Sequence, residues 1–281
     1  MARGDRELHC LERIIDDVFP DGRDFGAGVV NTSLLHSSVY GFAQDDWDTL
    51  CEDLASAKPN ADPSSFPDFI SGDTVLEHFE ITATIEGRKG SQFKRKHEPF
   101  MGSMRKGLGN LSVEDNPRAI SRAFPYPNQQ HVSLLDSLER NLSKHAESLR
   151  AFRVKHAISK AIFVIEHREY GLAMIEDVFG EIGSGRIFGD MREQQKFSSY
   201  RMSRDADALS ILADYAAEID VVVFVGVENI EFIKVAEIPD MLKLMPWPFV
   251  IAAGPTVELH TFLPVTRVCA PEKEGVDYEQ S

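Results

Sequence analysis

Apolar residues recur at helical spacing in four parts of the chain. The stripe over residues 8–19 predicts a first helix, and a second helix is expected to begin near Asp45, so that residues 1–58 form a helical N-terminal region. Two later stripes follow residues that commonly cap helices. They predict a long helix after Ser133 and another after Ser203.

The pattern changes from helical spacing to alternation between residues 66 and 86. Residues 66–70 indicate a short strand, residues 71–73 a tight turn, and residues 74–86 a long strand. Side chains of successive strand residues point to opposite faces. The second strand therefore has an apolar face and a polar face, and the segment predicts a β-hairpin with the apolar face in a core. The polar face comprises His78, Glu80, Thr82, Thr84 and Glu86.

Three further segments complete the expected fold. The apolar run 161–165 predicts a central strand, and 221–225 with 230–235 predict a second hairpin. Residues 87–132 are rich in Gly, Lys, Arg and Pro, which indicates a basic, irregular insertion. The order of elements predicts a single α/β domain over residues 1–281, with a mixed β-sheet flanked by helices.

Composition narrows the class of protein. Apolar residues make up 43% and charged residues 27%, which is typical of a globular chain. No apolar run is long enough to span a bilayer, and no signal peptide is evident, so a cytoplasmic protein without membrane contact is expected. Cys10, Cys51 and Cys269 lie far apart, in a spacing that predicts neither a disulfide framework nor a zinc site.

Charge is distributed unevenly along the chain. The net charge is −15, but residues 88–156 contain 14 basic and 6 acidic residues. Such a stretch is either a solvated surface or a strip that binds phosphate groups. The candidate nucleic-acid contacts in it are Arg88, Lys94, Arg95, Lys96, Arg105 and Lys106.

Two carboxylates of the first hairpin are candidate metal ligands. Asp68 ends the first strand and Glu80 lies on the polar face of the second, so the hairpin is expected to bring them together. Mg²⁺ and Mn²⁺ favour oxygen ligands of this kind. A bound metal activates water and neutralises charge on a phosphate.

The residues Pro67-Asp68 and Glu80-Ile81-Thr82 resemble the signature of the PD-(D/E)XK nuclease superfamily. The resemblance implies a restriction-endonuclease-like core with insertions, in which Asp68, Glu80 and the backbone carbonyl of Ile81 bind the metal. It also implies an additional acid on the preceding helix, for which Glu52 is the nearest candidate.

One position departs from the family pattern. Thr82 stands where the family has a catalytic lysine, and a threonine hydroxyl carries no positive charge. The lysine has either moved, to Lys89, Lys94 or Lys144, or the site has lost catalysis.

The resulting hypothesis is a magnesium-dependent endonuclease that hydrolyses phosphodiester bonds, with DNA favoured over RNA. The alternative is a non-catalytic nuclease-like or acidic interaction module that binds nucleic acid or a basic protein partner. A homodimer is compatible with either hypothesis.

Overall fold

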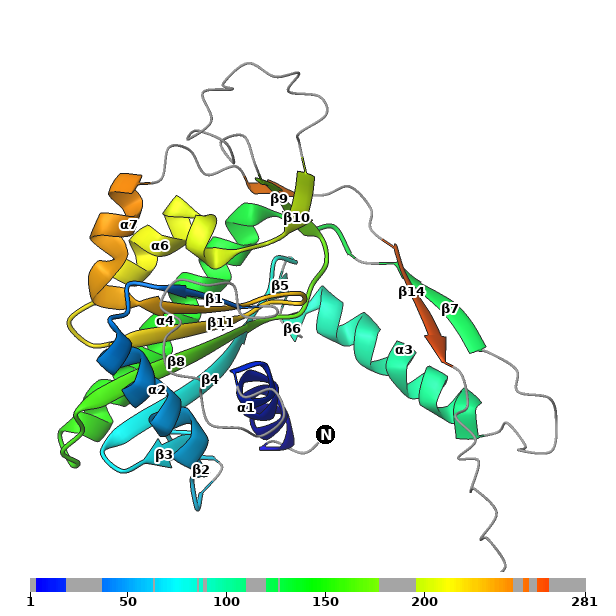
Figure 1. Cartoon of the computed structure of the whole chain (residues 1–281). Helices are drawn as coiled ribbons and strands as arrows, with labels where there is room; N and C mark the ends of the chain where they lie inside the picture. The colour runs from blue at the N-terminus through cyan, green and yellow to red at the C-terminus, as the bar shows by residue number, and fades with distance from the viewer. Residues whose placement is uncertain are drawn as a thin grey trace, which may run out of the picture.

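The computed structural model shows a mixed β-sheet between two layers of helices (Figure 1). This confirms the α/β class that the sequence predicts. The structure describes residues 4–18, 37–62, 64–84, 86–87, 90–109, 120–125, 127–176, 196–244, 250–252 and 257–262.

The main sheet has seven strands in the order β1-β12-β11-β8-β4-β3-β2. Strand β8 lies between β4 and β11 and runs parallel to both, as expected for the apolar run 161–165. The other neighbours are antiparallel except for the parallel pair β1 and β12. The strands are β1 (Ser37–Tyr40), β2 (Lys58–Pro59), β3 (Phe69–Ser71), β4 (Thr74–Ile81), β8 (Lys160–His167), β11 (Val221–Val225) and β12 (Ile230–Lys234).

Each face of this sheet packs against its own helices. The α4 face is covered by α4 (His131–Arg153), α6 (Ala206–Ala213) and α7 (Ile238–Leu244), and its core includes Leu138 and Phe163. The α1 face is covered by α1 (Asp5–Val18) and α2 (Gln44–Ser56), and its core includes Trp47 and Phe232. Because strand side chains alternate, neighbouring residues of β4 and β8 belong to different cores.

The first hairpin forms as predicted but is shorter. Strand β4 ends at Ile81 rather than at residue 86. The polar face of β4 was expected to lie away from a core, and the structure differs. His78, Thr82 and Thr84 are buried: His78 lies next to Cys10 of α1, whereas Thr82 and Thr84 hydrogen-bond to Glu169.

The described parts of segment 87–132 contain regular elements, whereas the sequence predicted an irregular insertion. These elements are β5 (Glu86–Gly87), β6 (Gly90–Ser91), the 18-residue helix α3 (Gln92–Gly109) and β7 (Ile120–Pro125). Strand β7 pairs with β14 (Val257–Phe262), and Phe93, Phe100 and Phe124 pack between α3 and β7. Helix α3, β7 and β14 form an arm that extends from the main sheet (Figure 1).

Two further predictions about helices differ from the structure. The N-terminal region is not purely helical, since β1 lies between α1 and α2. The helix expected after Ser203 is capped instead by Asp205, whose side chain accepts hydrogen bonds from the N–H groups of Asp207 and Ala208. Ser203 belongs to the 3-10 helix η3 (Met202–Arg204), and a second one is η4 (Val235–Glu237).

A small second sheet lies beyond one end of the main sheet. It consists of β9 (Leu172–Glu176), β10 (Lys196–Ser199) and β13 (Val250–Ala252). Across the ranges given above, no helix has both the length and the apolar character needed to cross a membrane.

Candidate functional site

Asp68 is bound to the middle of β4. Its Oδ2 accepts a hydrogen bond from the backbone N–H of His78 at 2.8 Å, and its own N–H donates to Glu77 Oε2 at 3.1 Å. Burial, followed by the negative charge of Glu77, raises the pKa of Asp68 to about 6. The surroundings of Asp68 therefore disfavour its ionised form.

Glu80 lies three residues further along β4 than Glu77 and has a different partner. Its Oε2 accepts a hydrogen bond from Arg6 of α1 at 2.8 Å, and its side chain is only 6% exposed. The acid that the hairpin register brings next to Asp68 is thus Glu77, not Glu80 as expected. The predicted tight turn, with Ser71 opposite Thr74, itself places Asp68 opposite Glu77, three residues before Glu80.

The acid that a helix contributes is also not the expected one. Glu52 is exposed on α2, whereas Glu7 of α1 is close enough to raise the pKa of Asp68. Helix α1 therefore brings both an acid, Glu7, and a cation, Arg6, to the candidate carboxylates. Its amphipathic stripe was evident in the sequence, but the strand residues that it would cover were not.

Thr82 does not face a metal site. Its hydroxyl donates to Glu169 Oε1, and its N–H donates to Ser137 Oγ at 3.3 Å. Thr82, which stands at the position of the family lysine, therefore hydrogen-bonds to a buried carboxylate. Ile81 has its side chain in the core of the α4 face.

The structure locates only some of the candidate cations. Arg95, Lys96 and Lys106 are exposed on α3, and α3 is joined to α1 by a contact of 3.2 Å between Arg6 and Glu98. Lys144 is exposed on α4, the helix that covers the opposite sheet face from α1, so it does not replace the missing lysine. Arg88 and Lys89, as well as the side chains of Lys94 and Arg105, lie outside the described residues.

Glu166 and His78 form a second group of polar side chains on the α1 face of the sheet. Glu166 of β8 is the Cα partner of Glu80, and its Oε2 lies 3.3 Å from His78 Nε2. Burial alone would raise the pKa of Glu166, but His78, Arg168 and Arg6 outweigh burial and hold it below its usual value. In the sequence, Glu166 merely follows the apolar run 161–165, and nothing there links it to His78.

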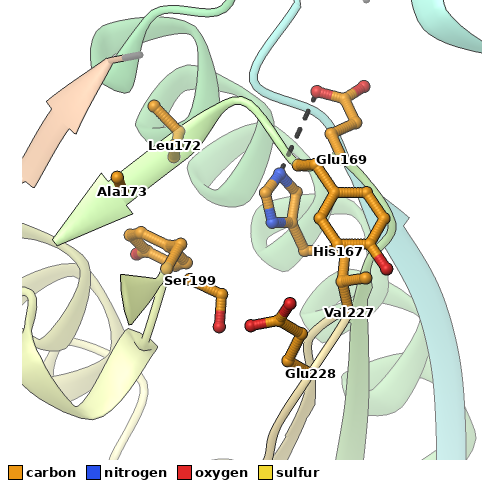
Figure 2. Close-up of a pocket in the computed structure, with 9 residues that line it drawn as sticks. His167, Glu169, Leu172, Ala173, Ser199, Val227 and Glu228 are labelled. Carbon is orange, nitrogen blue, oxygen red and sulfur yellow. Dashed lines mark ion pairs between the residues drawn. The ribbon is translucent and has the colours of Figure 1, made fainter. Parts of the chain in front are cut away.

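On the α4 face, the ends of β8 and β11 border a cavity of about 210 Å³. Figure 2 shows His167 in its wall, linked to Glu169, with the carboxylate of Glu228 directed toward Ser199. The remaining lining residues are Tyr170, Leu172, Ala173, Tyr200 and Val227. Sites in α/β sheets commonly form at the carboxyl ends of parallel strands, and this pocket has that position.

The titratable groups of the pocket are tuned by burial. Burial lowers the pKa of His167 to about 4 and raises the pKa of Glu169 to about 7, despite hydrogen bonds from Thr82 and Ala83 to that carboxylate. The imidazole is therefore neutral at pH 7, and the carboxyl group is partly protonated. This combination could bind a polar ligand or exchange a proton with it.

A third polar cluster joins α4 to α6. Asp205 Oδ2 contacts His131 Nε2 at 2.6 Å and accepts a hydrogen bond from Tyr200 at 2.7 Å. Its other carboxylate oxygen caps α6. Both oxygens of Asp205 are engaged, so the cluster has a structural explanation although Asp207 lies nearby.

Comparisons of the chain with known protein families, curated proteins and solved structures found no match. The function must therefore be argued from the residues and their geometry.

Proposed function

We propose that the chain is a metal-dependent nuclease that hydrolyses phosphodiester bonds of nucleic acid. The observation that carries the proposal is a pair of hairpin carboxylates in charged surroundings: the pKa of Asp68 is raised to about 6, and Glu80 contacts Arg6 of α1. The order of α2, hairpin, α4 and the parallel strand β8 is the order that the family resemblance implies.

The residues at this site fit a divalent cation. Asp68 has a pKa raised to about 6, and Glu7 and Glu77 add further negative charge close to it. A cation would relieve that repulsion. Asp68 and Glu80, with the carbonyl of Ile81 by resemblance, would hold Mg²⁺ or Mn²⁺. The metal would supply the activation of water and the neutralisation of phosphate charge.

Arg6 takes the electrostatic role of the absent lysine in this proposal. Its guanidinium group lies 2.8 Å from Glu80 and its side chain is 30% exposed, so it can also reach a phosphate. A guanidinium group stays charged and donates several hydrogen bonds, but it does not act as a base. Arg6 would therefore stabilise charge on the phosphate without removing a proton from water.

The arm supports binding of the polymer. Helix α3 contains five basic residues and one acid, and three of the basic side chains are exposed. Contacts between such side chains and the phosphate backbone give affinity without sequence readout. DNA is the proposed substrate, and RNA is tested beside it.

The test is a cleavage assay on plasmid, linear duplex DNA, single-stranded DNA and RNA, with Mg²⁺, Mn²⁺ or a chelator. Wild-type protein should cut at least one of these only when metal is present. Asp68→Asn and Glu80→Gln should each lower the rate by at least ~100-fold. Glu218→Gln is the matched control, because Glu218 forms an ion pair with Arg150 away from the site.

A non-catalytic role is the second candidate, favoured by the engagement of Thr82 with Glu169 and by the covering of Glu80 by α1. Nucleic-acid binding that Arg95→Ala/Lys96→Ala weakens, with no cleavage under any metal, would support this candidate and refute the nuclease. If folded protein neither cuts nor binds, both nucleic-acid functions are wrong.

A further inference from the structure

Three potential metal ligands from separate elements converge beneath α1. They are Cys10 of α1, His78 of β4 and Glu166 of β8. The cysteine sulfur, an imidazole nitrogen and a carboxylate oxygen all lie within 4.8 Å of one another. The three residues are 3%, 8% and 9% exposed, so the group is inside the protein rather than on its surface.

Two polar atoms in this group have unmet bonding capacity. His78 Nε2 and Glu166 Oε2 are buried, and neither has a hydrogen-bond partner among the residues that the structure describes. They lie 3.3 Å apart, but without the geometry of a hydrogen bond. Buried polar atoms are nearly always satisfied, because leaving one unpaired costs about 1–3 kcal/mol. A cation bound by both atoms would satisfy them.

The donor types indicate which cation. A thiolate, an imidazole and a carboxylate together are a ligand set for zinc, whereas magnesium requires oxygen ligands. Zinc lies about 2.0–2.3 Å from such atoms, which places its ligands roughly 3–4 Å from one another. The observed separations, at most 4.8 Å, need only small side-chain adjustments to reach this geometry.

We propose that Cys10, His78 and Glu166 bind Zn²⁺ and form a clasp that fixes α1 onto the sheet. Binding joins the Cys10 sulfur to the metal and releases its proton to solvent. The clasp is distinct from the proposed nuclease ligands Asp68 and Glu80. It would hold α1 where Arg6 and Glu7 reach those carboxylates, but its existence does not depend on nuclease activity.

The clasp also accounts for how α1 is retained over a polar part of the sheet. Helix α1 contributes apolar contacts through Cys10, Leu11 and Ile14, and Cys10 also lies next to the polar side chains of His78 and Glu166. Metal binding stabilises the folded state by a free energy that grows with the logarithm of its affinity. Removal of the metal is therefore expected to loosen α1 before the rest of the sheet unfolds.

The first test is the metal content of purified full-length protein, measured by plasma mass spectrometry after dialysis against zinc and then metal-free buffer. Wild-type protein should retain about one zinc ion per chain, and Cys10→Ser and Glu166→Gln should each lose it. Cys51→Ser is the matched control, since Cys51 is also a buried free cysteine but lies on α2 outside the cluster. Equal zinc retention in Cys10→Ser and wild type would overturn the proposal.

The second test uses Co²⁺, and its decisive measurement is made on wild-type protein. Wild-type protein titrated with Co²⁺ should develop the absorption band of a thiolate–cobalt bond and the visible bands of tetrahedral cobalt. Cys51→Ser should develop both, and Cys10→Ser should lack the thiolate band. Absence of the thiolate band in folded wild-type protein would refute the clasp.

These tests separate the clasp from the nuclease. Asp68→Asn should abolish cleavage while it retains zinc. Loss of zinc from Asp68→Asn, or retention of a full zinc ion by Glu166→Gln, would contradict the proposed ligand set.

Discussion

The two faces of the sheet at the ends of β4 and β8 handle buried carboxylates in different ways. On the α1 face, Glu80 contacts Arg6, and Glu166 lies near His78 and 3.8 Å from Arg168. On the α4 face, Glu169 accepts hydrogen bonds from neutral donors, the hydroxyl groups of Thr82 and Thr84 and the N–H of Ala83. The pKa of Glu166 is lowered and that of Glu169 is raised to about 7.

Burial alone therefore does not decide the pKa of Glu166 or Glu169. Both glutamates are buried, and in both the loss of hydration favours the protonated form. Positive charge reverses the direction at Glu166, whereas hydrogen bonds only limit the shift at Glu169. Nearby cations thus stabilise the charged form of the carboxylate on the α1 face, whereas the carboxylate at the pocket has only neutral hydrogen-bond donors.

The largest expected effect is the pH dependence that Glu169 gives to stability. Its pKa is about 7 in the folded state against an ordinary value of 4.5, so the folded protein binds the extra proton and loses stability as pH rises between these values. The contribution is about 3 kcal/mol over that interval. Urea unfolding of wild type and Glu169→Gln from pH 4.5 to 7.5 measures it.

His167 acts in the opposite direction and remains in both proteins of that comparison. Its pKa falls to about 4 from 6.5, so its contribution to stability increases as pH rises between these values. The stability of wild type minus that of Glu169→Gln should therefore fall by about 3 kcal/mol across the range. If the difference in stability between wild type and Glu169→Gln does not change with pH, the raised pKa of Glu169 is contradicted.

The next effect concerns the ion pair between Arg6 and Glu80. Arg6→Met leaves a carboxylate that is 6% exposed without its cation and should destabilise the protein by about 2 kcal/mol. Arg6→Met/Glu80→Gln should recover at least half of that loss, because the buried charge of Glu80 is removed together with the cation that contacts it. Additive losses in urea unfolding would show that the two side chains are not coupled.

Thr82→Val removes one hydroxyl donor from Glu169 at nearly constant volume. We expect a loss of about 1 kcal/mol, larger at pH 8 than at pH 5, because the hydrogen bond favours the charged carboxylate. Unfolding midpoints at the two pH values provide the measurement. An equal loss at both would mean that the hydroxyl does not favour the ionised form.

The smallest effect is expected at an exposed ion pair. Arg150 contacts Glu218 at 2.8 Å, but its side chain is 54% exposed. Arg150→Ala should cost less than about 1 kcal/mol, because water and salt screen such a pair. A loss as large as that of Arg6→Met would undermine the distinction between buried and exposed charge pairs.

The parts of the fold that the sequence predicts are those with a clear local pattern. The apolar stripes of α1, α2 and α4 and the apolar runs of β8 and β11 follow directly from spacing. Helix α3 was missed because Pro99 and several glycines interrupt its pattern, and its aromatic residues pack only once β7 is in place. Spacing within a segment carries no information about such a distant partner.

The candidate site was less predictable for the same reason. Alternation along β4 placed Glu80 and His78 on one face correctly, but the pairing of Asp68 with Glu77 depends on the turn register. The burial of that face depends on α1, some 70 positions away in the chain. Cys10 gave no metal-site signal because its partners, His78 and Glu166, lie on separate strands.

The most direct test of the proposed function is Mn²⁺ binding, measured by electron paramagnetic resonance on protein whose clasp has first been saturated with zinc. Wild-type protein should bind Mn²⁺, and Asp68→Asn and Glu80→Gln should each weaken binding by at least ~10-fold, whereas Glu218→Gln should not. Equal Mn²⁺ affinity in all four proteins would contradict the assignment of Asp68 and Glu80 as the ligands of a catalytic metal.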